Sequence, residues 1–258
     1  MKELSNRQEQ IRKLLSAHGR LGVGRLASRL QVAEMTIRRD LSALEQAGVL
    51  TRTHGGCVLQ SPFTAELSFP EKQRRRQGEK TAIAREVARQ LAPGNTVYLD
   101  TGTTALQVAR ALPADRQLRV FTNNLRVALE LFGRAGVEVV VYGGVLARKN
   151  PDLVDEIALA QISQYRLDVA IVGGDALEVA RGEFYGADTG SAALSRAAQR
   201  QADRVIVALD SSKFGKHSVA VAGRLAKGVT LITDDAVSPA DRAALRQTGA
   251  RIIFATTN

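Results

Sequence analysis

The sequence has 258 residues, a formal net charge of +10, and 45% hydrophobic against 24% charged residues. These proportions are ordinary for a globular protein, and the length suits two domains better than one. No apolar run approaches the roughly 18 residues needed to cross a bilayer, and the first residues lack the apolar stretch of a signal peptide. We therefore expect a cytoplasmic protein without a membrane partner.

Cysteine and histidine are scarce in this sequence. Cys57 is the sole cysteine, and there are three histidines. An internal disulfide is therefore excluded, and we expect neither a metal site nor a bound cofactor. A lone cysteine is typically a small buried hydrophobe, which is the role we expect for Cys57.

Positive charge is concentrated in the first third of the chain. Residues 1–80 hold 15 Lys and Arg against 8 Asp and Glu, whereas residues 81–258 hold 21 against 18. A basic segment of this kind is typical of proteins that bind a polyanion such as nucleic acid, although a solvated basic surface has the same balance.

Three helical patterns open the sequence, at residues 5–19, 23–30 and 33–47. Ser5 and Gln8 match a capping box, which satisfies the first free N–H groups of a helix. Short helices in such close succession predict a compact helical unit.

The third helical pattern has one apolar face and one polar face. Its inward stripe contains Ile37, Leu41 and Leu44. Long cationic side chains on the opposite face suit base edges and phosphates in a major groove. The candidate DNA-binding residues of this helix are Thr36, Arg38, Arg39 and Ser42. A protein-interaction module with solvated arginines is the alternative interpretation.

Residues 49–59 contain two short extended runs around Gly55-Gly56, which predicts a β-hairpin. A hairpin that follows a three-helix unit is a wing, and Arg52 and His54 lie where a wing contacts DNA. We therefore predict a winged helix-turn-helix DNA-binding domain over residues 1–60.

A connector follows at residues 61–80. It includes Pro62, Pro70 and a basic run over residues 72–80, which is typical of a linker between domains. A solvated charged surface and additional phosphate contacts both fit this run. The remaining residues, 81–258, are assigned to a second domain.

Short β-rich runs alternate with helical stretches in the second domain. The runs are residues 96–100, 118–122, 138–142, 168–173, 204–210, 229–233 and 251–254. Amphipathic segments such as 106–112 and 192–202 lie between several of them. This alternation predicts an α/β fold with a mainly parallel sheet, in which ligands bind beyond the carboxyl ends of the strands.

Polar loops follow at least four of these β-rich runs. Asp100-Thr-Gly-Thr-Thr104 leads into a helix whose N-terminus supplies free N–H groups for a phosphate. Lys213 supplies a cation for a phosphate or carboxylate. Each loop taken alone also fits an ordinary capped turn. The candidate effector-binding residues are Asp100, Thr101, Gly102, Thr103, Thr104, Asn123, Asn124, Gly143, Gly144, Asp175 and Lys213.

Two segments of the first domain resemble a known signature. Thr36-Ile-Arg-Arg-Asp-Leu41 and Gly48-Val-Leu-Thr-Arg-Thr-His-Gly-Gly56 closely resemble the DNA-binding signature of the DeoR family of bacterial regulators. The resemblance covers about residues 7–59. It implies that the third helix is used for recognition and that His54 belongs to a wing.

The second domain resembles the sensor domain of the same family, at residues 100–104, 122–124, 143–144 and 210–215. This resemblance implies a fold similar to ribose-5-phosphate isomerase and glucosamine-6-phosphate deaminase, with phosphorylated sugars or related metabolites as effectors. Three segments look most like the glycerol-3-phosphate regulon repressors of the family, which implies an effector similar to glycerol-3-phosphate. They are residues 122–125, 162–168 and 212–215.

The chain also departs from the family pattern. The family usually has Gly near the position of Asp155, and Glu and Lys where Ser191 and Ser195 stand; the segment 178–191 differs in length. The two serine positions remove a cation and a carboxylate near the expected pocket. These departures bear on which effector is bound.

The sequence therefore favours a ligand-responsive repressor that binds double-stranded operator DNA. Bacterial helix-turn-helix proteins usually bind paired half-sites, so we expect a homo-oligomer, a dimer or a tetramer. An activator is compatible with the same features. The alternative from another class is a sugar-phosphate isomerase or deaminase fused to a DNA-binding module, with Asp100, Asp175 or Asp210 as acid or base. Because the spacing reveals no catalytic pair, we expect no enzymatic activity.

Overall fold

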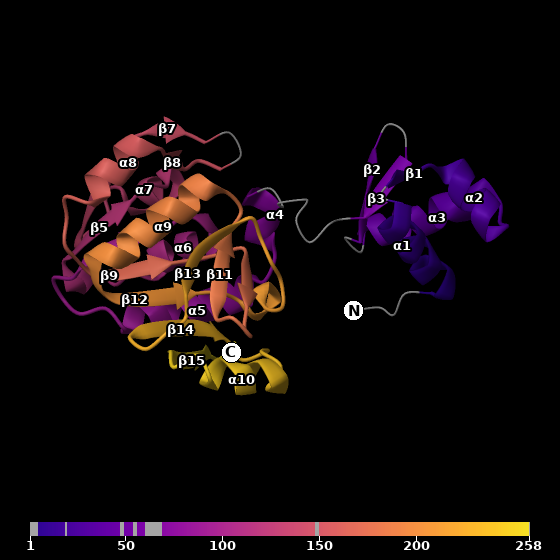
Figure 1. The fold of residues 1–258 in the computed structure, drawn as a ribbon. Coiled ribbons are helices and arrows are strands. Elements are labelled where there is room, and N and C mark those ends of the chain that lie inside the picture. The colour runs from indigo at the N-terminus through magenta and orange to yellow at the C-terminus, as the bar shows by residue number, and fades with distance from the viewer. Residues whose placement is uncertain are drawn as a thin grey trace. The chain divides into compact units, whose positions relative to one another are not determined.

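The computed structural model describes residues 5–18, 20–46, 49–53, 56–59, 69–147 and 150–257. The chain forms two compact units, Met1–Ala65 and Glu66–Asn258, whose folds are drawn in Figure 1. None of the helices in the described part of the chain is long and apolar enough to span a membrane.

The N-terminal unit consists of three helices and a small antiparallel sheet. Its elements are α1 (Asn6–His18), β1 (Arg20–Leu21), α2 (Val23–Leu30), α3 (Glu34–Gln46), β2 (Leu50–Thr53) and β3 (Gly56–Leu59). The capping box is confirmed, because the Ser5 N–H donates to Gln8 Oε1 (3.0 Å) and the Gln8 N–H donates to Ser5 Oγ (3.3 Å). Helix α2 ends at Gln31, which has the left-handed conformation.

One apolar core holds this unit together. Its buried members include Ile11, Leu15, Leu21, Leu26, Ile37, Leu41, Leu44, Leu50 and Cys57. The inward stripe of α3 is thereby confirmed, as is the burial of the lone cysteine. Asp40 is also buried, and the Arg7 guanidinium pairs with both of its carboxylate oxygens, so α1 and α3 are joined by an ion pair beside the core.

Strand β1 was not predicted, and it explains the conformation of Gly56. Strand β3 pairs with both β2 and β1, and Gly56 stands opposite Thr53 as the first residue of β3 rather than within the turn. A Cβ at Gly56 would lie 2.5 Å from the carbonyl oxygen of Leu21, and the backbone φ is +151°. Only glycine fits this close approach without strain.

The C-terminal unit is built on a seven-stranded sheet in which every neighbouring pair is parallel. The strand order is β15-β14-β12-β9-β4-β5-β6. These strands are β4 (Thr96–Leu99), β5 (Leu118–Thr122), β6 (Val137–Val141), β9 (Leu167–Val172), β12 (Ala202–Ala208), β14 (Val229–Asp234) and β15 (Arg251–Ala255). All seven predicted β-rich runs are thus strands of one sheet, and the α/β fold is confirmed.

Helices cover both faces of this sheet (Figure 1). One face packs against α5 (Gln77–Arg89), α6 (Gly102–Ala111) and α7 (Leu125–Leu131). The other packs against α8 (Glu156–Ile162), α9 (Thr189–Gln201) and the residues around α10 (Pro239–Arg246). A sheet buried on both faces requires apolar side chains on both sides of each strand, which is why its strands are near-continuous apolar runs.

Several short elements escaped the sequence analysis. An antiparallel sheet contains β10 (Ala176–Glu178), β11 (Glu183–Gly186) and β13 (Ala220–Arg224), and a two-stranded sheet contains β7 (Val145–Leu146) and β8 (Leu153–Val154). The described part of the unit also contains two 3-10 turns, η1 (Ala114–Arg116) and η2 (Ser211–Lys213). Strands of two to five residues carry too little periodicity to be recognised from sequence.

The assignment of residues 69–80 to a linker requires correction. Residues Phe69–Arg74 form α4, and α5 begins at Gln77. Phe69 is buried beneath the Arg126 guanidinium, whose carbon lies 4.4 Å from the ring centroid. The buried Lys80 amine donates to the carbonyl oxygens of Lys72 and Arg75. These contacts make the segment part of the C-terminal unit.

Gly56→Ala should destabilise the N-terminal unit by on the order of 1–3 kcal/mol, because the new Cβ forces β1 and β3 apart. Differential scanning calorimetry of the full chain measures this change. Gly78→Ala is the matched control: Gly78 lies in α5 with open space where a Cβ would stand, so alanine should stabilise that helix slightly. An unchanged melting temperature for Gly56→Ala would contradict the close approach.

Candidate functional site

The outer face of α3 presents the predicted DNA-binding side chains. Arg38 and Arg39 are exposed and Thr36 is half-buried. Arg38 Nη2 lies 3.3 Å from Glu34 Oε2, and Ser42 Oγ donates to the Arg38 carbonyl oxygen at 3.0 Å. Arg39 therefore lies opposite the buried stripe, with Ser42 nearby, and Thr36 and Arg38 flank this exposed side of the helix.

The predicted wing is a two-stranded hairpin, with Thr53 paired to Gly56. Arg52 belongs to β2, but its side chain is outside the described part, and His54 also lies outside the described residues. The backbone thus supports the hairpin, while the DNA contacts of Arg52 and His54 stay predictions.

A pocket opens in the C-terminal unit where β4, β9 and β12 end. Seven of the eleven predicted effector residues line it: Asp100, Thr101, Gly102, Thr103, Thr104, Asp175 and Lys213. Its lining also includes Phe69, Lys72, Asn150, Asp152, Asp188, Ser191 and Ser195. Because β4, β9 and β12 are neighbours in a parallel sheet, loops far apart in the sequence meet at this edge.

The loop between β4 and α6 supplies the hydroxyl groups and helix N-terminus of the pocket. Thr101 is the N-cap of α6 and makes no side-chain cap hydrogen bond, and Gly102 has a φ of +96°. The Thr101 N–H donates to Asp100 Oδ1 at 2.8 Å. The end of α6 with free N–H groups thus faces a pocket rich in hydroxyls, a setting that favours an anion.

Asp100 is a buried carboxylate surrounded by hydrogen-bond donors. Its oxygens accept from the Thr101 N–H, from Tyr98 OH (3.2 Å) and from the Gly173 N–H (3.3 Å). Burial raises the pKa of Asp100 to about 6, and the backbone hydrogen bonds only partly offset that effect. Asp100 therefore changes charge close to neutral pH.

Asp175 lies between two lysines. Its Oδ1 atom is 2.7 Å from Lys72 Nζ and 3.8 Å from Lys213 Nζ. Burial favours a higher pKa for Asp175, but the two ammonium groups outweigh it and leave the pKa below its ordinary value. Sequence reasoning missed Lys72 because its polar, basic neighbourhood resembled a linker.

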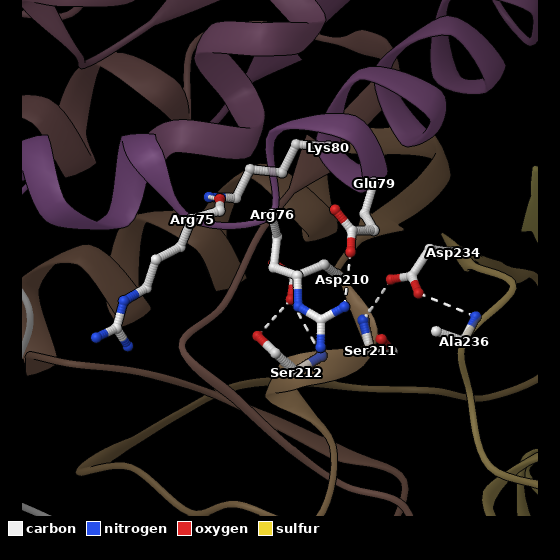
Figure 2. Close-up of polar contacts among 9 residues, drawn as sticks. All are labelled: Arg75, Arg76, Glu79, Lys80, Asp210, Ser211, Ser212, Asp234 and Ala236. Atoms are coloured by element: carbon white, nitrogen blue, oxygen red, sulfur yellow. Dashed lines mark hydrogen bonds and ion pairs between the residues drawn. The ribbon is translucent and has the colours of Figure 1, made fainter. Parts of the chain in front are cut away.

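The loop that carries Lys213 is fixed by two buried carboxylates at the ends of β12 and β14 (Figure 2). Asp210 Oδ1 accepts from the Ser212 N–H at 3.1 Å, and Asp234 Oδ2 accepts from the Ser211 N–H at 2.6 Å. Figure 2 also shows Arg76 beside this turn, paired with Glu79 at 2.6 Å. The buried acids thus position η2 through its backbone.

Four predicted effector residues lie outside the pocket lining. Asn124 caps α7 by accepting from two backbone N–H groups, both at 2.9 Å, and Asn123 Nδ2 donates to the Leu153 carbonyl oxygen. The Gly143 N–H donates to Gln161 Oε1 at 2.7 Å, and Gly144 has a φ of +135°. None of the four lines the pocket with Lys213, but Asn123 is close to Asp100, because Tyr98 OH lies within hydrogen-bond distance of both Asn123 Oδ1 (3.0 Å) and Asp100 Oδ1 (3.2 Å).

Of the three positions that depart from the family pattern, two lie in the pocket lining and one caps a helix. Ser191 and Ser195 both line the pocket, and Asp188 Oδ1 accepts from the Ser191 N–H at 2.8 Å. Asp155 has a φ of +146°, a conformation that favours glycine, and its carboxylate caps α8 by accepting from the Ile157 N–H at 2.8 Å. The cap offsets part of the backbone strain.

A winged helix-turn-helix joined to a parallel α/β unit with a polar pocket defines a DNA-binding transcription regulator with a sensor domain. Residues 7–63 match the DeoR-like helix-turn-helix domain, and residues 75–235 match the DeoR C terminal sensor domain. The chain belongs to the DeoR family. We accordingly call its two parts the DNA-binding unit and the sensor unit.

Curated relatives of similar length have regulatory names. The transcriptional repressor AccR of Agrobacterium fabrum is 36% identical over 89% of both chains. The glycerol-3-phosphate regulon repressors of Escherichia coli and Haemophilus influenzae are 31% and 34% identical, over 89% and 90% of this chain and 90% and 89% of theirs. The chain is therefore a transcription regulator, and the enzyme alternative is set aside.

Solved structures align with about half of the chain. Ribose 5-phosphate isomerase A from Methanocaldococcus jannaschii is 18% identical, with a TM-score of 0.39 over 52% of this chain and 53% of the isomerase. The eIF2B delta subunit from Chaetomium thermophilum is also 18% identical, with a TM-score of 0.42 over 59% and 58% of the two chains.

The ionisation of Asp100 should make the stability of the sensor unit depend on pH. Because its pKa is higher in the folded chain than the ordinary 3.8, ionisation costs stability as pH rises from about 4 through about 6. The free energy of unfolding of Asp100→Asn, taken relative to that of the parent protein, should therefore increase by about 1 kcal/mol when the pH is raised from 5 to 7.5. Denaturant unfolding at both pH values tests this, and a constant difference would contradict it.

Proposed function

We propose that this protein represses genes of carbohydrate or glycerol metabolism and releases its operator when the sensor unit binds a phosphorylated metabolite. The observation that carries the proposal is the pocket at the ends of β4, β9 and β12, where Lys72, Lys213 and the start of α6 offer an anion site. The same chain supplies a helix-turn-helix through which the pocket can act.

On the DNA side, we propose that α3 lies in the major groove. Arg38 and Arg39 are exposed there, and the i, i+4 pair between Arg38 and Glu34 is weak enough to open when a base or phosphate competes for the arginine. Thr36 and Ser42 supply hydroxyl groups on the same helix, and Arg52 and His54 remain the proposed wing contacts. Phosphate contacts should provide much of the affinity and make it salt-dependent.

On the effector side, the relatives named as glycerol-3-phosphate regulon repressors support a phosphorylated ligand. A phosphate group pairs with lysine ammonium groups and with helix N-terminal N–H groups, and the pocket has both. Ser191 and Ser195 place small neutral hydroxyls in the pocket lining. We propose that these hydroxyls contact the uncharged part of a sugar or polyol phosphate.

Release of DNA requires that the effector bind the two states of the protein with different affinity. We further propose that the chain acts as a homo-oligomer, a dimer or a tetramer, because operator half-sites are usually read in pairs. A cytoplasmic location belongs to the same proposal, since bacterial operator DNA lies there.

Arg39→Ala should cost on the order of 1–3 kcal/mol of binding to the operator if Arg39 contacts a base edge. Fluorescence anisotropy at fixed salt, with DNA from upstream of the protein's own gene, measures this loss. Arg119→Ala removes the same charge from an exposed position in the sensor unit and serves as the control. Equal losses on operator and random DNA would identify Arg39 as a phosphate contact instead.

Lys213→Ala should abolish release of the operator by glycerol-3-phosphate or by the active member of a panel of sugar phosphates, while DNA affinity without effector stays unchanged. The reason is the loss of a pocket cation that pairs with the ligand phosphate. Lys227→Ala, at an exposed position away from the pocket lining, should release normally. Normal release by Lys213→Ala would show that the effector binds elsewhere.

A further inference from the structure

Three charged side chains from separate segments meet in the sensor pocket. Lys72 belongs to α4, Asp175 lies in the loop between β9 and β10, and Lys213 belongs to η2. Asp175 Oδ1 is 2.7 Å from Lys72 Nζ and 3.8 Å from Lys213 Nζ. All three line the pocket and remain partly accessible, with side chains 17%, 28% and 22% exposed respectively.

The backbone near each of these side chains is fixed by its own contacts. The carbonyl oxygen of Lys72 accepts from the buried Lys80 amine. The Asp175 N–H donates to the Tyr185 carbonyl oxygen at 2.7 Å, and the Lys213 N–H donates to the Asp210 carbonyl oxygen at 3.0 Å. The two ammonium groups are thus held on a common carboxylate by separate parts of the sensor unit.

A carboxylate between two ammonium groups occupies the position that a ligand anion would take. Carboxylate and phosphate both accept charge-assisted hydrogen bonds from lysine, but a phosphate monoester carries a charge of about −1.5 to −2 and three acceptor oxygens. A phosphate group can therefore satisfy both lysines more fully than one carboxylate does. An anion that reaches this corner of the pocket has to compete with Asp175.

We propose that Lys72 and Lys213 form the anion subsite of the sensor pocket, and that the Asp175 carboxylate occupies this subsite until the phosphate group of the effector displaces it. This inference rests on the proposed function, since it assigns the place of the effector's phosphate. Asp175 is then an internal competitor that raises the effector concentration needed for a response.

The position of Lys72 in the chain gives the displacement a consequence for regulation. Helix α4 is the first described element of the sensor unit in chain order, and the chain on its N-terminal side leads to the DNA-binding unit. Phe69 of the same helix also lines the pocket. A change of partner at Lys72 therefore occurs in the described helix of the sensor unit that is nearest in sequence to the DNA-binding unit.

The alternative is that Asp175 only fastens α4 through an ion pair, and the two roles predict opposite effects of one substitution. Asp175→Asn keeps the size and shape of the side chain. If Asp175 competes with the ligand, Asp175→Asn should bind inorganic phosphate about tenfold more tightly than the parent chain, an effect within the usual range for neighbouring charged groups. If Asp175 only fastens α4, phosphate affinity should stay the same or fall.

Isothermal titration calorimetry of the full chain with inorganic phosphate measures this affinity. Asp188→Asn is the matched control, because it removes another pocket carboxylate while asparagine keeps the helix cap of α9. Its effect should be clearly smaller, and an equal gain from both variants would overturn the proposal. Thermal unfolding and operator binding of each variant establish that it is folded.

A double-mutant cycle tests the partnership with Lys72. Lys72→Gln should weaken phosphate binding, and in that background Asp175→Asn should give little further gain. Independent effects of the two substitutions would contradict the shared subsite. Operator binding, measured without phosphate, tests the proposed function. A failure of that function is therefore distinguished from a failure of the subsite proposal, which the phosphate titration tests. Should Lys72→Gln not fold, Asp175→Asn compared with Asp188→Asn still decides the question.

Discussion

The parallel arrangement of the strands in the main sheet determines where the sensor unit can form a ligand pocket. Every strand of that sheet ends at the same edge, and β12, β9 and β4 are neighbours there, so loops from distant parts of the sequence share one pocket. Asp100, Asp175 and Lys213 follow these three strands and therefore come together at this edge. A different strand order would scatter the same side chains, and the pocket would lose its opposed charges.

Several buried polar groups around the pocket form hydrogen bonds to the backbone and hold its loops in place. This role distinguishes them from the side chains that are proposed to contact the ligand. Asp210 and Asp234 accept from the N–H groups of η2, while Lys80 donates to the carbonyl oxygens of Lys72 in α4 and of Arg75 just after it. Because each buried charge has hydrogen-bond partners, its desolvation is compensated locally. The result is that Lys72 and Lys213 enter the pocket from supports that are already ordered.

Sequence patterns predicted the fold well where burial imposes a regular spacing. The inward stripe of α3 and the seven runs of the parallel sheet were recognised for that reason. The site was recognised less completely, because a pattern reports the residue type and not its partner. Asn124 caps α7 through contacts that the pattern of its loop does not reveal, whereas Lys72 was assigned to a linker and lies against Asp175. Only tertiary contacts distinguish these cases.

Chemical labelling of the Cys57 thiol can report when the core of the DNA-binding unit opens. The thiol is fully buried in the core beside β1, within 3.3 Å of the Leu21 carbonyl oxygen, and the chain has no other cysteine. A thiol reagent can therefore modify the protein only when this core opens. The labelling rate measures the opening equilibrium of the DNA-binding unit in the intact chain, free of any signal from the sensor unit.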